Sequence, residues 1–277
     1  MIRVGTRGSA LALAQASWVA QRLLEPYEIV RIEAAGPVDD KSRWVSGLER
    51  ALLAGEIDVA VHSAKDVPAE IADGLELVAI PAREDPRDAI CGAPSLAELA
   101  PGARVGTSSL RRAAQIRAAR PDLEVVEIRG NVDTRLRKLA DGQCDALVLA
   151  VAGLVRLGRE DAVDGILDEL VPAAGQGALA LEARPGAVAV ARTLSDPDAS
   201  ACVTAERELT RALGASCNTP VGAHARVVER GELELTGWVG RADGSAWARD
   251  TVRGPSVGLG ALVADRLLSA GAGELLS

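Results

Sequence analysis

The sequence predicts an α/β protein with two successive α/β units and a small α+β domain after them. Its 277 residues exceed the usual size of one domain, so two or three domains of about 100 residues are expected. Short apolar runs typical of strands alternate with longer amphipathic segments typical of helices, and this pattern occurs twice. After residue 195 the order changes to a helix, a cysteine-bearing loop, three alternating strands and a helix.

The first unit shows the βαβ order typical of a parallel sheet. Strands are expected near Val4 and over 29–32, 57–61 and 75–80, and helices over 9–24 and 42–54. The apolar stretch in the first of these helices superficially resembles a signal peptide. The spacing of Leu11, Gln15 and Trp18 suits an amphipathic helix better, so no secretion leader is expected.

The second unit repeats this order after the turn-rich segment 83–88. Strands are expected near 103–105, 125–128 and 146–150, with helices between them. In open α/β sheets ligands bind at the carboxyl ends of the strands, and the charged motifs of this chain lie at those ends. We therefore expect a ligand crevice at this edge.

The composition restricts the kinds of partner. The chain carries a net charge of -8, whereas proteins that bind nucleic acid or anionic membranes normally present a basic surface. No nucleic-acid or membrane partner is expected, and no segment reaches transmembrane length. The cysteines and histidines have no spacing suited to zinc, so no metal site is expected, and reduced thiols in the cytosol fit best.

The segment 105–112 predicts an anion-binding site. A short apolar strand runs through Thr107 and Ser109 into a helix that begins with Arg111 and Arg112. A helix N-terminus offers unpaired N–H groups and a partial positive charge, hydroxyls can cap it, and a guanidinium can bind a carboxylate through two hydrogen bonds. The ligand should therefore be acidic.

A second segment, 127–135, repeats the pattern of strand, Gly-Asn turn and helix with a cation, so several carboxylates or phosphates are expected on the ligand. The commoner arrangement for charges at such spacing is the solvated face of one helix. That face would include Arg111, Arg112, Arg117 and Arg120, and position favours binding only for the first two. Arg156 ends a further strand-to-helix step, where its spacing fits both interpretations equally.

An ionisable cluster follows a buried strand in the segment 59–68. A carboxylate such as Asp66 beside a cation such as Lys65 can accept an N–H bond, stabilise a developing positive charge and move a proton. At an arbitrary strand end such a pair is more often simply solvated. A single histidine such as His62 is more often structural than catalytic.

Cys217 lies in the small-residue loop 213–222. A thiol in an exposed loop near cations can ionise and act as a nucleophile, although an inert loop residue is equally compatible with the sequence. Cys91, Cys144 and Cys202 lie in apolar segments and are expected to pack.

The order of these motifs resembles the porphobilinogen deaminase (hydroxymethylbilane synthase) family over nearly the whole chain. The run Val61-His62-Ser63-x-Lys65-Asp66-Val67-Pro68 and the block Gly106-Thr107-Ser108-Ser109-Leu110-Arg111-Arg112 are each highly specific. The other matching segments are 6–9, 83–88, 129–135, 175–177 and the Cys217 loop.

The resemblance implies a transferase that joins four porphobilinogen molecules head to tail, with loss of ammonia, and releases hydroxymethylbilane by hydrolysis for haem and other tetrapyrroles. In the family a dipyrromethane cofactor is bound by a thioether to the loop cysteine, here Cys217. The implied fold has two periplasmic-binding-protein-like domains, residues 1–84 with 173–194 and residues 85–172, around a cleft, and a third domain over 195–277. A monomer in the cytoplasm is the family expectation.

By position, Asp66 matches the family's catalytic carboxylate, which contacts pyrrole N–H groups, assists ammonia loss and stabilises an azafulvenium-like cation. The acetate and propionate arms of porphobilinogen explain the many arginines on an acidic protein. The residues implied to bind substrate or cofactor are Arg7, Ser9, Ser63, Lys65, Thr107, Ser109, Arg111, Arg112, Arg129, Arg135 and Arg156.

The chain departs from the family between Ile32 and Leu48, where a longer, glycine-rich mobile lid is usual. Lys41 is expected to keep a lid-lysine role, and Trp44, at a position that holds Phe in the family, to stack on a pyrrole. A shortened lid would shield the cation from water less well, which would alter the rate or product release but not the fold.

A second hypothesis, of another class, is a non-catalytic two-lobed binding protein for an acidic ligand. The implied fold and the short lid suit it, and it predicts no covalent adduct at Cys217. A secreted version would also need a signal peptide, which is not expected.

Overall fold

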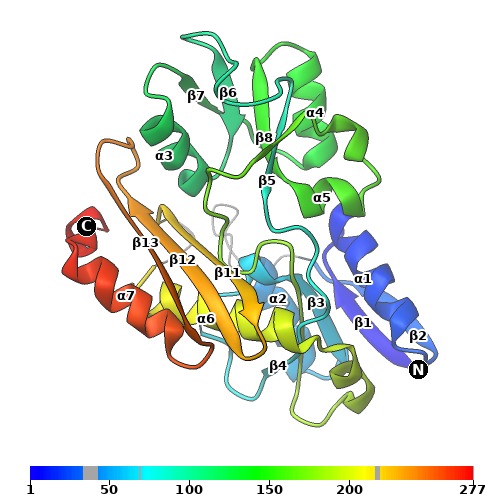
Figure 1. The fold of residues 1–277 in the computed structure, drawn as a ribbon. Coiled ribbons are helices and arrows are strands. Elements are labelled where there is room, and N and C mark those ends of the chain that lie inside the picture. The colour runs from blue at the N-terminus through cyan, green and yellow to red at the C-terminus, as the bar shows by residue number, and fades with distance from the viewer. Residues whose placement is uncertain (34–42, 69, 216–218, 277) are drawn as a thin grey trace. The chain divides into compact units, whose positions relative to one another are not determined.

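The computed structural model describes residues 1–33, 43–68, 70–215 and 219–276. It contains two compact units, one made of Met1–Glu84 and Gly177–Val203, the other of Asp85–Gln176 and Thr204–Ser277. Each unit has a five-stranded sheet, and the second also has a three-stranded sheet (Figure 1). The α/β class with a small C-terminal α+β region is confirmed, while the boundaries of three domains stay a prediction.

The sheet of the first unit has the order β2-β1-β3-β10-β4. Its strands are β1 (Ile2–Thr6), β2 (Tyr27–Arg31), β3 (Val59–Ser63), β4 (Glu76–Ala79) and β10 (Leu179–Ala183). β1 is parallel to β2 and β3, as predicted, but β10 runs antiparallel to both of its neighbours. The sequence pattern did not predict β10 as a strand of this sheet, because β10 comes from a distant part of the chain and not from a βαβ crossover.

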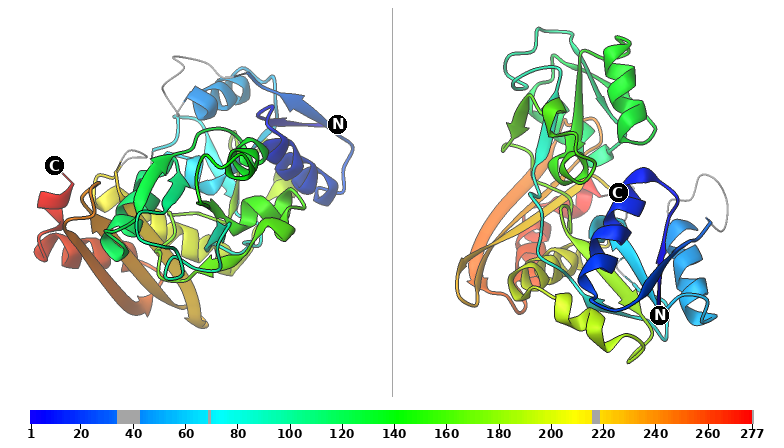
Figure 2. Two further views of the ribbon diagram at one scale, coloured as in Figure 1. Left: turned by 90° about the horizontal axis from the view of Figure 1, so that it is seen from above. Right: turned by 90° about the vertical axis from the view of Figure 1, so that its right-hand side faces the viewer.

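Helices cover both faces of this sheet. α1 (Ala10–Arg22) begins at Ser9, whose Oγ accepts a hydrogen bond from the Ala12 N–H at 3.2 Å. Apolar residues of α1 pack with Val59 and Val61, and those of α2 (Arg43–Leu53) pack with Ala60. Successive side chains of a strand point to opposite faces, so the two helices lie on opposite sides of β3 (Figure 2).

The larger sheet of the second unit has the order β7-β6-β8-β5-β9. Its strands are β5 (Asp88–Cys91), β6 (Arg104–Thr107), β7 (Glu124–Glu127), β8 (Ala146–Ala150) and β9 (Gly165–Leu167), and its helices are α3 (Leu110–Ala119), α4 (Val132–Ala140) and α5 (Val151–Arg156). β6 is parallel to β7 and β8, and β5 is antiparallel to β8 and β9. Both five-stranded sheets thus place three parallel strands in the order second, first, third, followed by an antiparallel strand.

The three-stranded sheet is an antiparallel meander with the order β11-β12-β13. Its strands are β11 (Val221–Glu229), β12 (Glu232–Gly240) and β13 (Trp247–Pro255), and its helices are α6 (Pro197–Ala212) and α7 (Leu259–Ser269). Both helices pack against the middle strand, since a Cβ at Gly237 would lie 2.8 Å from Leu267 and 3.1 Å from Leu209. Short 3₁₀ turns complete the fold: η1 (Ala64–Asp66), η2 (Glu160–Ala162), η3 (Ala189–Leu194) and η4 (Ala272–Leu275).

Cys91, Cys144 and Cys202 are buried, as expected for thiols that pack as small groups in the interior. Among the described residues, no helix is long and apolar enough to cross a membrane. The same residues contain no group of three His, Cys, Asp or Glu side chains that could hold a metal ion.

The close approach of α7 to α6 at Gly260 gives a testable prediction. A Cβ there would lie 2.6 Å from Glu208 Cβ and 2.7 Å from the Leu209 nitrogen. We expect Gly260→Ala to lower the free energy of unfolding by about 1–3 kcal/mol, as overpacking does. Gly273→Ala is the control, because a Cβ at that position would make an ordinary 3.8 Å contact with Leu268. Equal melting temperatures of the two variants would contradict the prediction.

Candidate active site

The predicted Lys65 and Asp66 cluster lies in the turn η1, directly after β3. The Ala64 N–H donates to the Ala178 carbonyl at 3.0 Å, which ties the turn to the segment leading into β10. Asp66 is 47% exposed, and its Oδ2 lies 3.4 Å from Nη1 of Arg7. Arg7 follows β1, the parallel neighbour of β3, so the cation and the carboxylate meet at the carboxyl ends of adjacent strands.

The hydroxyl of Ser63 is held by Gln15 on the face of the sheet that α1 covers. Gln15 is buried, and its Nε2 donates to Ser63 Oγ at 3.0 Å. Ser9, predicted to bind carboxylates, caps α1 in this structure. The structure thus brings Arg7, Ser63 and the η1 turn to one end of the sheet. Gln15 was missed as a site residue, and its signal is an amide within the apolar face of the helix.

The start of α3 has the capped geometry that the sequence predicts. Ser109 Oγ accepts a hydrogen bond from the Arg112 N–H at 3.4 Å, and Thr107 Oγ1 accepts one from the Ser109 N–H at 3.2 Å. These hydroxyls satisfy N–H groups that would otherwise be unpaired at the helix end. The prediction of a helix N-cap in this segment is confirmed.

Arg111 and Arg112 do not lie on a solvated helix face, because both side chains are buried. Their side chains are 5% and 6% exposed and surround Asp88, which is fully buried. Arg112 donates to Asp88 Oδ1 from Nε at 3.0 Å and from Nη2 at 2.7 Å, and Arg111 Nη1 lies 2.8 Å from Oδ2. The carboxylate that the two arginines hold in this structure belongs to the protein itself, and their binding of a ligand carboxylate stays a prediction.

Backbone carbonyls complete this buried cluster. Arg111 Nη1 donates to the Val171 carbonyl at 2.7 Å, and Arg112 Nη1 donates to the Val148 carbonyl at 3.1 Å. The first turn of α3 therefore contacts β8 and the segment after β9. The burial of two cations is possible because each has a charged partner and further acceptors.

The charges of this cluster control the protonation of Asp88. Burial raises the pKa of the Asp88 carboxyl, but the two neighbouring guanidiniums outweigh it and hold that pKa well below its usual range. Burial also lowers the pKa of Arg111, and Asp88 opposes this shift. Asp88 is therefore ionised throughout the physiological range.

Gln176 joins the same cluster from the segment before β10. Its Nε2 donates to Asp88 Oδ1 and to the Pro86 carbonyl, both at 2.7 Å. Sequence reasoning noted Gln176 and Asp88 only as parts of matching segments. The signal that would have singled them out is a buried position: Asp88 opens an apolar strand, and Gln176 stands between two glycines.

The remaining predicted cations lie around α4 and α5. Asn131 caps α4 by accepting a hydrogen bond from the Thr134 N–H at 2.8 Å. Arg135 is half-buried and donates to the Gly130 carbonyl at 2.7 Å; its burial, and then the charge of Arg112, lower its pKa. Arg135 is therefore electrostatically part of the cluster around Asp88. Arg129 is exposed and its Nε lies 2.8 Å from Glu127 Oε1, while Arg156 is half-buried in the last turn of α5.

Cys217 and Lys41 lie outside the described residues. Trp44 belongs to the first turn of α2, and its side chain is likewise outside the description. Cys217 stands between the end of α6 and the start of β11. The Glu206 carboxylate of α6 links these elements, because it accepts hydrogen bonds from the N–H groups of Ala225 in β11 at 2.8 Å and Gly175 at 2.7 Å.

Comparison with known families accounts for this set of residues. A family model described as "Porphobilinogen deaminase, dipyromethane cofactor binding domain" matches residues 2–192, and the "Porphobilinogen deaminase, C-terminal domain" model matches residues 200–269. The chain belongs to the porphobilinogen deaminase family. The motifs that carried the resemblance in the sequence lie within these two matches.

Relatives of the family cover nearly the whole chain. The porphobilinogen deaminase of Deinococcus radiodurans is 46% identical over 302 residues, with 99% of this chain and 97% of that protein covered. The porphobilinogen deaminase of Pelobacter propionicus is 45% identical, with 99% and 96% covered. Among solved structures, the methionine binding protein MetQ aligns with 70% of this chain and 89% of its own at 15% identity, with a TM-score of 0.45.

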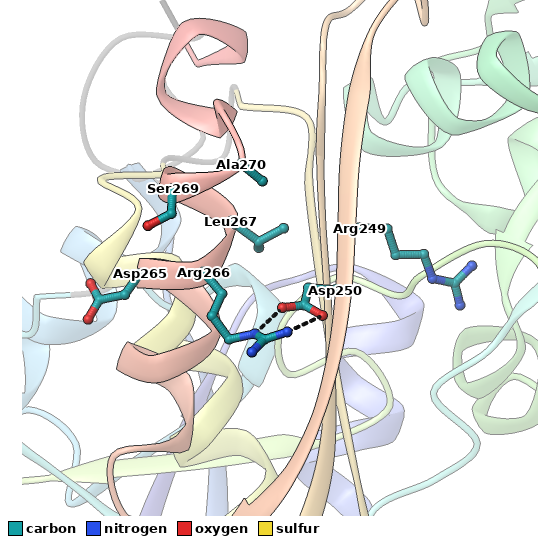
Figure 3. Close-up of a pocket in the computed structure, with 7 residues that line it drawn as sticks. All are labelled: Arg249, Asp250, Asp265, Arg266, Leu267, Ser269 and Ala270. Atoms are coloured by element: carbon teal, nitrogen blue, oxygen red, sulfur yellow. Dashed lines mark hydrogen bonds and ion pairs between the residues drawn. The ribbon is translucent and has the colours of Figure 1, made fainter.

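None of the family-motif residues lines the pocket drawn in Figure 3, which lies beside α7 and β13. Two charged residues of its lining form an ion pair, in which Arg266 Nε lies 2.5 Å from Asp250 Oδ2. Asp250 and Arg266 point toward each other across the space between the helix and the strand (Figure 3). The pocket is therefore separate from the porphobilinogen deaminase motifs.

The Asp88 cluster gives a prediction for stability. We expect Asp88→Asn to lower the free energy of unfolding by about 3–5 kcal/mol, because an amide cannot compensate two buried guanidinium charges. Asp168→Asn is the control, since Asp168 is 74% exposed and pairs with the exposed Arg87. This control should change stability by less than about 1 kcal/mol.

The difference in unfolding free energy between wild type and Asp88→Asn should depend on pH. The folded pKa of Asp88 lies below the unfolded value of about 3.9, so its contribution is complete at neutral pH and falls as the pH drops below about 4. Urea unfolding of wild type and Asp88→Asn should therefore differ by a constant amount above about pH 5 and by less near pH 3. An equal stability of the two proteins at pH 7 would contradict the prediction.

Proposed function

We propose that this chain catalyses the porphobilinogen deaminase reaction, the stepwise condensation of four porphobilinogen molecules with loss of ammonia and hydrolytic release of hydroxymethylbilane. The observation that carries the proposal is an exposed carboxylate, Asp66, held beside Arg7 at the carboxyl ends of β1 and β3 in a chain that belongs to this family. The family match covers the residues on which the chemistry depends.

Asp66 is proposed as the catalytic carboxylate. Loss of ammonia from porphobilinogen leaves a cation whose charge is shared with the pyrrole nitrogen. A nearby carboxylate stabilises that charge and accepts a hydrogen bond from the pyrrole N–H. The geometry supports this role, because Asp66 keeps an accessible side chain on a turn that backbone hydrogen bonds hold. Arg7 lies close enough to orient the carboxylate.

The cations of the second unit are proposed to bind carboxylate arms. Arg111, Arg112 and Arg135 carry three positive charges against the single charge of Asp88, and this excess fits a group that bears several carboxylates. The acetate and propionate arms of porphobilinogen, and of a dipyrromethane made from it, have that chemistry. The proposed binding residues are Arg7, Ser9, Ser63, Lys65, Thr107, Ser109, Arg111, Arg112, Arg129, Arg135 and Arg156.

Cys217 is proposed to carry the dipyrromethane cofactor through a thioether. When bound, the cofactor supplies the pyrrole carbon that attacks the first substrate unit. The residues of this chain would hold its carboxylates and exclude water around it. Lys41 and Trp44 are proposed to act in the shortened lid, Lys41 on a carboxylate and Trp44 by stacking on a pyrrole.

The setting proposed for this activity is the cytoplasm, with the protein acting as a monomer on a small-molecule substrate. The wide spacing of the four cysteines in the sequence supports a reducing compartment. The net charge of -8 opposes binding to nucleic acid. The three-domain division at residues 84, 172 and 194 is likewise proposed, and the three separate sheets support it.

The proposed cofactor predicts a change in mass. Protein expressed in a host that makes porphobilinogen should have an intact mass raised by two pyrrole units, and peptide mapping should locate the addition at Cys217. Cys217→Ala should have the unmodified mass, and the buried thiols Cys91, Cys144 and Cys202 should remain unmodified in both proteins. An unmodified wild-type protein would favour the hypothesis of a non-catalytic binding protein.

The proposed role of Asp66 predicts loss of turnover without loss of fold. Asp66→Ala should lower kcat by at least about 100-fold, because one electrostatic contact to the transition state is removed. Its melting temperature should stay close to wild type, since the side chain is exposed and its pair with Arg7 is a surface pair. Asp265→Ala, an exposed carboxylate on α7, should leave kcat unchanged. Undiminished product formation by Asp66→Ala would refute the role.

A further inference from the structure

A buried pair of ionisable groups lies beneath the Asp66 turn and takes no part in the chemistry described so far. His62 Nε2 lies 2.9 Å from Glu182 Oε2, and the two side chains are 3% and 0% exposed. Within the described part of the chain, the other carboxylate oxygen of Glu182 has no hydrogen-bond partner. The hydrogen bonding of this buried carboxylate therefore depends on His62.

The pair crosses from β3 to β10 on the face that α2 covers. In the antiparallel register Ala180 stands opposite His62 and Glu182 stands opposite Ala60. Glu182 therefore lies on the same face as His62, as its diagonal neighbour two residues beyond the directly opposite position. α2 contributes Glu49 to the surroundings of the pair. Burial raises the pKa of Glu49, and the negative charge of Glu182 adds to this shift.

The opposite face of β3 is held in a different way. Ser63, the next residue after His62, is hydrogen-bonded to Gln15 of α1. The last two residues of β3 are thus each held by a polar partner, one on each face of the sheet. Ala64 and the turn with Lys65 and Asp66 follow directly.

We propose that His62 and Glu182 are positioning residues, whose buried hydrogen bond holds the end of β3 and thereby the place of the Asp66 carboxylate. This proposal rests on the proposed function, because it concerns the geometry of the same site. The reason is mechanical. A turn that begins directly after a strand moves with the end of that strand, and a directional bond restrains the strand more narrowly than apolar contact does. Small displacements of a catalytic group lower the rate strongly.

The test compares two double variants that differ in directional bonding. His62→Leu/Glu182→Leu replaces the pair by apolar groups, a change that buried pairs often tolerate in folding. His62→Gln/Glu182→Gln replaces both ionisable groups by amides and keeps a donor and an acceptor. We expect both to fold. We expect the apolar variant to lose about 10-fold in kcat with little change in KM, and the amide variant to retain most of the wild-type kcat.

A second readout does not depend on activity. The Ala64 N–H is bonded to the Ala178 carbonyl, so hydrogen exchange of the peptide that contains Ala64 reports the order of the turn. Exchange should be faster in the apolar variant than in the amide variant. Val59→Ala, which removes buried apolar contact from the same strand on the α1 face, is the matched control and should change neither kcat nor this exchange.

The proposal would be overturned if the apolar variant kept the wild-type kcat and the wild-type exchange at Ala64. It would also be overturned if Val59→Ala changed kcat and exchange as much as the apolar variant does. If wild type itself makes no hydroxymethylbilane, the proposed function fails, and the exchange at Ala64 alone decides the positioning role. If the apolar double variant does not fold, Glu182→Met, studied near pH 8 where a free histidine is neutral, replaces it with the same two readouts.

Discussion

The Asp88 carboxylate is the group around which the charged interior of the second unit is built. The first turn of α3 points two guanidiniums inward, and without a carboxylate between them this turn could not be buried. Gln176 shares an oxygen of Asp88 with Arg112, so the loop before β10 is joined to the same centre. Two guanidiniums against one carboxylate leave a net positive charge in this interior, and the charge of Arg112 also acts on Arg135.

Other buried polar side chains form hydrogen bonds with backbone groups. Gln115 bonds both backbone groups of Val171, donating to the carbonyl at 2.9 Å and accepting from the N–H at 2.7 Å. Glu206 accepts from the N–H groups of Gly175 and Ala225. Val171 and Gly175 lie outside the strands, and Ala225 lies in the edge strand β11, so side chains satisfy backbone groups that no ladder bond reaches. Buried polar residues therefore stabilise irregular segments and a sheet edge.

The sequence predicted what depends on local pattern. The helices that begin after Ser9 and Ser109, the strands before Arg7 and Lys65, and the meander near the C-terminus all follow from periodicity and capping residues. The antiparallel β10 could not be predicted from periodicity, because its neighbours β3 and β4 come from more than a hundred residues earlier. The partners of Arg111 and Arg112 were missed for the same reason, since Asp88 and Gln176 are distant from them in sequence and periodicity does not show which residues meet.

The strand order of the first unit also has a consequence for how the chain is made. β10 stands between β3 and β4, so these two strands cannot join one sheet until residues 179–183 have been synthesised. The second five-stranded sheet needs only residues 88–167, and all of its strands leave the ribosome earlier. Since chains emerge from the N-terminus at a limited rate, the five-stranded sheet that begins first is completed after the other five-stranded sheet. During that interval the facing edges of β3 and β4 lack their strand partner and need protection from other chains.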